Sequence, residues 1–299
     1  MAKMSKAVKE TIQTIIFILV VVLLVVVYIV YPLNRSKAFL GRVNLDDFSE
    51  DSTLVNDPTY YIEAGLPADS FTFEADAFTM LACLKITADS AQGTVILLPA
   101  DNQSRDSLLP LVQLLNDNKL NVITYDQRAS GLTSGKYRGD GQLESKDLLA
   151  LISTLEIREQ IVHPLAVVGF QTGGDAALLA ELEESRIQKI VAVDPYLTTK
   201  RMQNINKERY NAYWFPFYRT VMWWWYNMRS GYAEGYRDIE AIKSIEVPTL
   251  IIVDPKYQED EELSQLVELS DKNLLDVKNI AETNALYQNI IEFIKNSAN

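Results

Sequence analysis

The fold of this 299-residue chain is decided by one stretch, Val167-Val168-Gly169-Phe170-Gln171-Thr172-Gly173-Gly174-Asp175-Ala176-Ala177-Leu178. The stretch predicts a short buried strand that passes through a tight turn into a helix. Gly169 and Gly173 flank the turn, and their missing side chains leave room for a strained backbone between them. The turn therefore presents Gln171 at the end of the strand. Its amide is not a nucleophile at neutral pH, and no nearby base could make it one.

Short apolar runs alternate with amphipathic patterns on both sides of this turn. The predicted strands are Phe71–Phe73, Met80–Ile86, Thr94–Leu98, Val122–Tyr125, Leu165–Phe170, Ile190–Val193, Thr249–Val253 and Leu274–Val277. The predicted helices are Leu108–Leu115, Glu144–Leu155, Ala176–Glu183, Ala241–Ile245 and Leu286–Ile294. This alternation is typical of a mainly parallel sheet with helices on both faces. The first two strands have no helix between them, which predicts an antiparallel hairpin.

From about residue 60 to its end, the chain resembles the α/β-hydrolase family. Gly169–Gly173 is similar to the G-x-S-x-G turn that carries the family's nucleophile. Residues 125–135, YDQRASGLTSG, resemble the family's D-x-R-G-x-G-x-S loop, and Val247–Ile252 resembles the strand before its acidic catalytic residue. Asp194-Pro195-Tyr196, followed by aromatic residues, is similar to membrane-anchored hydrolases related to the Bem46 and serine aminopeptidase groups. The resemblance implies an α/β-hydrolase fold, and we expect residues 196–236 to form a lid over the carboxyl ends of the strands.

The nucleophile and the oxyanion loop of the family are both missing. Gln171 stands where the family has its nucleophilic Ser. Thr172 follows it, at the position whose backbone N–H serves the oxyanion. Pro99-Ala100 stands where the family has His-Gly in its oxyanion loop. The resemblance therefore implies a degenerate hydrolase site.

The acidic and basic positions are not matched either. The family pattern puts the carboxylate near Lys256-Tyr257, so Asp254 comes too early and Asp260 rather late. The catalytic His belongs around residues 281–284, where the sequence is AETN. The only histidine of the chain, His163, precedes the strand that leads to the turn, roughly 20 Å from it at the strand rise. We interpret it as a surface loop residue, because a base must lie within hydrogen-bond reach of its nucleophile.

Two other kinds of chemistry are conceivable at this edge of the sheet. Thr172 could act as an unusual nucleophile, and Asp101, Asp126 and Asp254 could gather around a cation. Carboxylates near strand ends are common, however, so no metal is expected. We interpret Asp126 and Arg128 as a structural pair that braces the loop.

Composition excludes several classes of protein. One cysteine, Cys83, and one histidine exclude an internal disulfide and a multi-cysteine zinc or iron–sulfur site. The formal charge of -12 argues against nucleic-acid binding. The sequence has no phosphate-binding glycine loop, so no cofactor is expected. Ser130 and Ser134 lie in a turn-rich loop and are interpreted as turn residues.

The N-terminal part reads as a membrane anchor. Residues 1–10 form a short basic terminus, 11–31 a transmembrane helix, 32–58 a polar tether, and 59–299 the hydrolase-like domain. The apolar segment is roughly 30 Å long as a helix, the thickness of a bilayer core. A cleaved signal peptide is the alternative, with Ser36 and Ala38 as small residues at its end. Basic residues nearly balance across the span, and we expect the N-terminus in the cytoplasm and the domain outside.

Three adjacent tryptophans stand out in the predicted lid. On a helix, Trp223, Trp224 and Trp225 point in different directions, so they cannot all be buried on one face. The simplest interpretation has two of them packing the lid onto the domain and one partly exposed. A membrane-interface contact or a protein-binding surface is the alternative.

These observations predict a membrane-anchored protein with an α/β-hydrolase fold that has lost hydrolase catalysis. Its expected partners are the bilayer, through residues 11–31, proteins of a membrane complex, and an apolar ligand under the lid. Two alternatives stay open: a membrane-anchored ester or amide hydrolase with an atypical active site, and a carrier of a lipid or small molecule.

Overall fold

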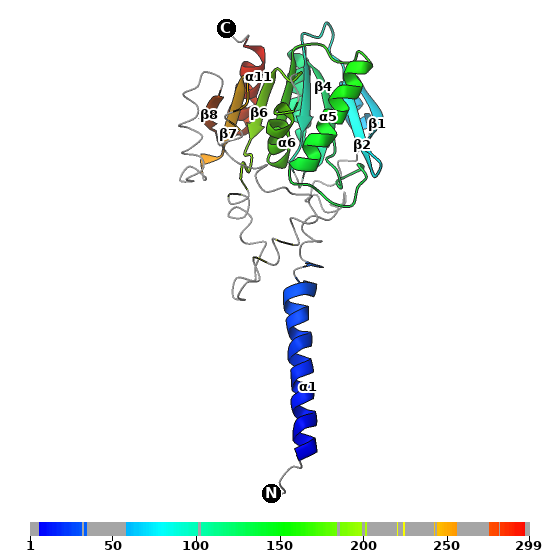
Figure 1. The fold of residues 1–299 in the computed structure, drawn as a ribbon. Coiled ribbons are helices and arrows are strands. Elements are labelled where there is room, and N and C mark those ends of the chain that lie inside the picture. Colours follow the sequence, from blue (N-terminus) through cyan, green and yellow to red (C-terminus); the bar gives the residue numbers. More distant parts are fainter. Residues whose placement is uncertain are drawn as a thin grey trace.

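One eight-stranded sheet forms the centre of the protein (Figure 1), with the strand order β1-β2-β4-β3-β5-β6-β7-β8. The computed structural model describes residues 6–31, 33–34, 58–100, 103–183, 186–198, 201, 220, 224, 242, 244–255, 275–280 and 282–296. The strands are β1 (Ala68–Asp76), β2 (Thr79–Ile86), β3 (Thr94–Leu98), β4 (Asn121–Tyr125), β5 (Leu165–Phe170), β6 (Lys189–Val193), β7 (Thr249–Val253) and β8 (Leu275–Asn279).

The sheet is parallel from β4 to β8 and antiparallel at its β1 edge. β1 pairs with β2 in an antiparallel hairpin, and β2 pairs antiparallel with β4. All other neighbours are parallel. The predicted mainly parallel sheet with an antiparallel start is confirmed. Because the parallel strands share one direction, their carboxyl ends meet at one edge, which is the lower edge of the sheet in Figure 1.

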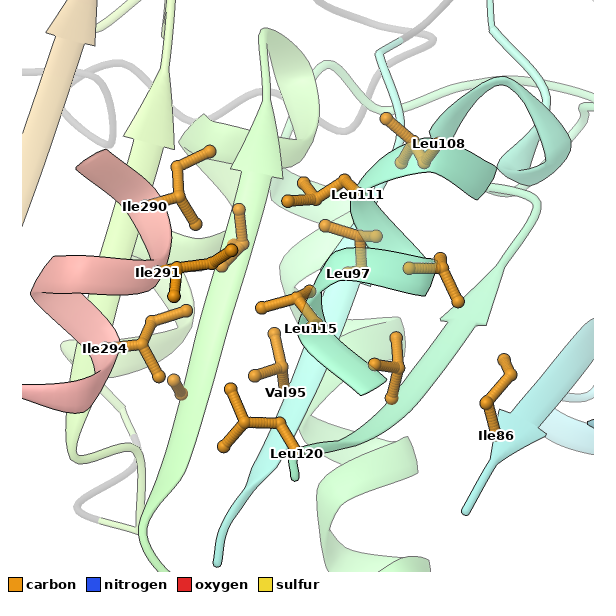
Figure 2. Packing of buried hydrophobic residues seen from close by; sticks show 14 of the residues in the cluster. Ile86, Val95, Leu97, Leu108, Leu111, Leu115, Leu120, Ile290, Ile291 and Ile294 are labelled. Carbon is orange, nitrogen blue, oxygen red and sulfur yellow. The ribbon is translucent and has the colours of Figure 1, made fainter. Parts of the chain in front are cut away.

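Helices cover both faces of the sheet, as predicted. Their bounds are α3 (Pro58–Glu63), α4 (Leu109–Asp117), α5 (Gln142–Ile157), α6 (Thr172–Glu181) and α11 (Thr283–Lys295). On one face, α5 and α6 enclose a buried cluster with side chains such as Ile96 and Val167. On the other face, α4 and α11 pack over Val95 and Leu97 of β3, and Figure 2 shows their leucines and isoleucines converging there.

Alternation along each strand explains why both faces are filled. In β3, every residue from Thr94 to Leu98 is buried, with Ile96 in one cluster and Val95 and Leu97 in the other. A strand buried on both faces needs an apolar residue at nearly every position. The continuous apolar runs in the sequence are the signature of that environment.

Several helices begin earlier than the sequence pattern predicts, α6 and α5 among them. α6 starts at Thr172, directly after the turn and ahead of the predicted Ala176. α5 starts at Gln142, where the side chain of Glu144 accepts hydrogen bonds of 2.8 Å from the backbone N–H groups of Gly139 and Gly141. Of the predicted helix at residues 241–245, Ile242 is helical, Ser244 lies in a turn and Ile245 has no regular structure, while residues 241 and 243 lie outside the described residues.

The N-terminal helix stands clear of the sheet (Figure 1). α1 spans Lys6–Val25 and continues as a π-helical segment, η1 (Val26–Val30), and none of its residues is buried. It begins ahead of the predicted start at Thr11. Among the described residues, Lys6–Val30 is the one helix long and apolar enough to cross a membrane, and a signal sequence would pass the same test.

Candidate functional site

The turn between β5 and α6 holds Gln171 in a strained conformation. Gln171 has φ 48° and ψ −115°, a backbone conformation that residues other than glycine rarely adopt. Two backbone hydrogen bonds fix it: its N–H donates to the carbonyl of Val193 at 2.8 Å, and its carbonyl accepts from the N–H of Asp175 at 3.0 Å. The strand, the turn and the first turn of α6 therefore form one rigid unit that presents position 171 at the carboxyl edge.

The flanking glycines are required by close packing. A Cβ atom on Gly169 would lie 2.1 Å from the carbonyl oxygen of Gly173, inside the turn itself. A Cβ on Gly173 would lie 2.8 Å from the Cβ of Leu98 and 2.9 Å from the carbonyl oxygen of Pro99. The missing side chains thus let α6 begin against the end of β3. The packing of the fold alone requires both glycines, whether or not the turn carries a nucleophile.

An amide side chain connects the degenerate oxyanion loop to the turn. The buried Gln127, from the loop after β4, donates from Nε2 to the carbonyl oxygen of Pro99. Its Oε1 accepts a hydrogen bond of 3.4 Å from the hydroxyl of Thr172. Pro99, Ala100 and Thr172 are all buried. The Thr172 hydroxyl is therefore held by a neutral amide that cannot accept its proton as a base would.

Gln127 was not predicted as a site residue, because the carboxylate and the serines of this loop are the side chains that indicate chemistry. An amide within the Asp-x-Arg pattern carries no signal of its own. Its role follows from the sheet order: β4 lies beside β3, and β3 lies beside β5, so three loops meet at one edge.

The only histidine of the chain lies at the opposite edge of the sheet. His163 comes just before β5, and its Nδ1 lies 3.0 Å from Oε1 of Gln188, which precedes β6. Its Nε2 lies 3.0 Å from Oε1 of Glu156, near the end of α5. The whole length of β5, roughly 20 Å at the strand rise, separates it from Gln171.

The carboxyl ends of β6 and β7 carry Asp194 and Asp254. Asp194 follows β6 with φ 48°, its N–H donates to the carbonyl of Ile252, and its Oδ1 accepts from the N–H of Asp254 at 2.7 Å. This carboxylate thus joins the two strand ends. Tyr257, the other residue named for the acidic region, lies outside the described residues, as does Asp101.

The predicted pairing of Asp126 with Arg128 is wrong. The guanidinium of Arg128 instead bonds Asp147 of α5, through Nε and Nη2 at 2.8 and 2.6 Å, and Asp76 of β1 at 3.0 Å. Asp126 accepts from the backbone N–H groups of Arg105 and Leu132, at 3.0 and 3.1 Å. The two side chains therefore have separate partners, Arg128 on α5 and β1, and Asp126 in backbone N–H groups that include one of its own loop.

Asp126 is consequently turned into the protein. It is fully buried, and a Cβ on Gly131 would lie 2.3 Å from its Oδ2, so the loop closes tightly around the carboxylate. Within the part of the chain that the structure describes, no three His, Cys, Asp or Glu side chains gather as a metal site would require. Ser134 serves the loop as a turn residue: its hydroxyl accepts from the N–H of Met80 at 2.7 Å.

Burial shifts the pKa of several groups beneath this edge. Asp106 lies 3.8 Å from Nε of Arg105, and burial raises its pKa to about 6 against the opposing effect of that guanidinium. Burial raises the pKa of Asp147 to about 6 in the same way, although Arg128 lowers it. The thiol of Cys83 is buried and its pKa is raised to about 12, so it is unreactive at neutral pH.

A carboxylate of α6 bonds to the first residues of the predicted lid. Asp175 accepts hydrogen bonds from the N–H groups of Tyr196 and Leu197, at 3.2 and 2.8 Å. It thereby fixes the chain as it leaves β6, a role the sequence analysis did not assign. Of the three tryptophans, Trp224 is helical and 55% exposed. Trp223 and Trp225 lie outside the described residues.

Comparison with known proteins bears on the fold. No protein-family model matches the chain, and no curated protein does. Among solved structures, an esterase from Pyrococcus furiosus aligns with a TM-score of 0.63 at 20% identity, covering 80% of this chain and 93% of its own.

Two further solved structures align over similar lengths. An α/β hydrolase from a Penicillium species aligns with a TM-score of 0.57 at 15% identity, covering 77% of this chain and 98% of its own. An α/β hydrolase from Sphaerobacter thermophilus aligns at 0.52 and 16%, covering 75% and 100%.

The chain has the α/β-hydrolase fold. The fold that the sequence resemblance implies is therefore confirmed by these structures, which are hydrolases or esterases by name. At this level of identity the likeness concerns the fold, and the chemistry rests on the site itself.

Proposed function

We propose that this chain is a membrane-anchored α/β-hydrolase-like protein that acts by binding, without hydrolase catalysis. One observation carries the proposal: the only histidine of the chain lies at the amino edge of β5, while the turn with Gln171 lies at its carboxyl edge. A hydrolase of this fold needs a base within hydrogen-bond reach of the nucleophile. Here position 171 has neither a nucleophilic atom nor a histidine within reach.

The surroundings of Thr172 support the same proposal. Its hydroxyl meets the side-chain oxygen of Gln127, and the other end of that amide is bonded to Pro99. Neither Gln127 nor the Pro99 carbonyl titrates near neutral pH, so this contact does not activate the hydroxyl as a nucleophile. Gln127 acts as a structural tie between the degenerate turn and the degenerate oxyanion loop.

The buried carboxylate of this edge is also committed to structure. Both oxygens of Asp126 accept backbone hydrogen bonds and its side chain is fully buried, so the carboxylate is engaged in holding the loop. This geometry weighs against the atypical hydrolase. We extend the proposal to the Bem46-like group on the residues Asp194-Pro195-Tyr196 and the aromatic stretch that follows them.

Anchoring by the N-terminal helix completes the proposal. None of the residues of α1 is buried, and some of its apolar side chains, Phe17 and Leu19 among them, are more than half exposed. Such a surface is stable in a bilayer and costly in water. The protein would then present its carboxyl edge and the lid to partners at a membrane.

Co-purification of the full-length chain from its native membrane in mild detergent, followed by native mass determination, tests the binding role. A stoichiometric protein partner or a bound apolar molecule is expected. A lone, ligand-free monomer would contradict it. As a matched comparison, Asp175→Asn weakens the hydrogen bonds to the backbone of Tyr196 and Leu197, where the predicted lid starts. We expect it to reduce the recovery of a partner bound there.

A further inference from the structure

An exposed apolar patch lies at the carboxyl edge beside the hairpin of β1 and β2. Phe78 in the hairpin turn is 87% exposed, Leu132 in the loop after β4 is 52% exposed, and Met80 is 41% exposed. Exposed apolar side chains are common singly, but a group at one rim indicates a contact surface. These three residues are called the hairpin patch below.

Hydrogen bonds hold the two parts of the hairpin patch together. The N–H of Ser134 donates to the carbonyl of Met80 at 2.9 Å, and the hydroxyl of Ser134 donates to that of Phe78 at 3.3 Å. The N–H of Ala82 donates to the hydroxyl of Thr133 at 2.9 Å. These hydrogen bonds fix the loop to the hairpin. The apolar side chains of the hairpin patch therefore project from a rigid support.

The tether reaches the domain on the same side. The hydroxyl of Tyr61, in α3, donates to the carbonyl of Arg105, which lies beyond the carboxyl end of β3. The chain then runs to the other edge, where β1 begins with Ala68 opposite Ile86. Residues 35–57 connect this entry point to the apolar N-terminal helix, and they can span at most roughly 80 Å when fully extended.

We infer that the hairpin patch docks on the lipid surface in which the N-terminal helix is anchored. The inference rests on the proposed anchoring. Nearby, Lys136 is exposed and its Nζ lies 5.4 Å from the ring centre of Tyr137, a basic and aromatic pair of the kind found at membrane–water interfaces. The tether keeps the domain close to the bilayer, so a small apolar contact suffices to orient it.

Charge around the hairpin patch selects the kind of lipid. Glu74 and Asp76 on β1 are exposed beside it, and Asp76 is neutralised by Arg128 at 3.0 Å. The rest of the molecule is acidic, with a formal charge of -12. Docking is therefore expected on zwitterionic phosphatidylcholine and should not increase when anionic lipid is added.

The test places an environment-sensitive NBD fluorophore on Phe78→Cys in the full-length chain, reconstituted in phosphatidylcholine vesicles. Ile157→Cys is the matched control, because Ile157 is 83% exposed and ends α5, directly after Glu156, which contacts His163 at the opposite edge. Cys83 is buried with a raised thiol pKa, so it does not compete for the label. Labelling of the unsubstituted chain verifies this.

We expect the emission maximum of the label at residue 78 to shift to shorter wavelength, and nitroxide-bearing lipid to quench more than half of that emission. The label at residue 157 should respond only to iodide in the water. Equal, water-like behaviour at both positions in a chain that resists carbonate extraction would overturn the docking alone. Extraction of the chain by carbonate would overturn the anchoring and the docking with it. Protection of residue 78 in native membranes but not in pure lipid would replace the lipid by a protein partner.

Discussion

Arg128 and Asp147 form a two-armed ion pair, with Nε and Nη2 of the guanidinium donating to the two carboxylate oxygens at 2.8 and 2.6 Å. Their side chains are only 8% and 2% exposed. The pair fastens the loop after β4 to α5, and a third bond from Arg128 reaches Asp76 on β1. The loop that closes the carboxyl edge thus depends on partners from two other elements.

Breaking this pair should destabilise the protein strongly. Asp147→Ala leaves the buried guanidinium with only its half-exposed partner, and we expect a loss of about 3–5 kcal/mol in the free energy of unfolding. Asp76→Ala removes the exposed partner and should cost about 1 kcal/mol or less. Urea unfolding of both full-length variants in detergent measures the difference. Equal, small losses would show that the pair is not the main support of the loop.

The turn should not tolerate a side chain at residue 169. Gly169→Ala places a Cβ against backbone atoms of Gly173 and Gly174, and we expect failure to fold or a loss above about 4 kcal/mol. Gly174→Ala is the control, because its Cβ would meet the nearest atom at 3.1 Å, and about 1–2 kcal/mol is expected. Thermal unfolding compares them. A well-folded Gly169→Ala variant would show that the turn is looser than described.

Asp106 should make stability depend on pH in an unusual direction. Burial raises its folded-state pKa to about 6, so between about pH 4 and 6 the folded state holds a proton that the unfolded state has released. This group's contribution to stability therefore falls as pH rises through that window, by on the order of 3 kcal/mol. Asp106→Asn removes the contribution, so the difference in stability between variant and wild type should change across pH 4–6. A constant difference would contradict the shifted pKa.

The anchor and its orientation can be tested together in intact cells. The full-length chain should stay in the membrane pellet after carbonate extraction, whereas arginine at both Leu19 and Leu23 should release it, because a charge at the bilayer centre costs about 3 kcal/mol or more. With the N-terminus inside, Ile157→Cys should react with a membrane-impermeant maleimide added outside. Reaction only after lysis would reverse the orientation.

The sheet was predictable from the sequence because its strands are buried on both faces. β3, β5 and β7 match the predicted apolar runs at both ends, and each of these runs borders residues such as Pro99, Gln171 or Pro248 that mark where it begins or ends. The start of α6 was predicted too late, since Thr172-Gly173-Gly174 has poor helix propensity. Tight packing of these glycines against Leu98 outweighs that propensity.

The contacts of the site were less predictable than its position. The order of motifs placed Gln171, Pro99 and Asp254 at one edge, because parallel strands end together. Which side chains meet there depends on neighbours far apart in the chain, as Gln127 with Thr172 and Arg128 with Asp76 show. A loop sequence of alternating polar residues does not indicate which of them turn inward.

The lack of hydrolase catalysis is the central claim, and ester turnover by the purified full-length chain tests it most directly. p-Nitrophenyl esters should be hydrolysed no faster than in buffer alone by the wild type and by the variants Gln171→Ala, Thr172→Val and Gln171→Ser. The reason is that no histidine lies near residue 171 in any of them. Turnover by the wild type that Gln171→Ala or Thr172→Val abolishes would contradict the account and establish an atypical hydrolase.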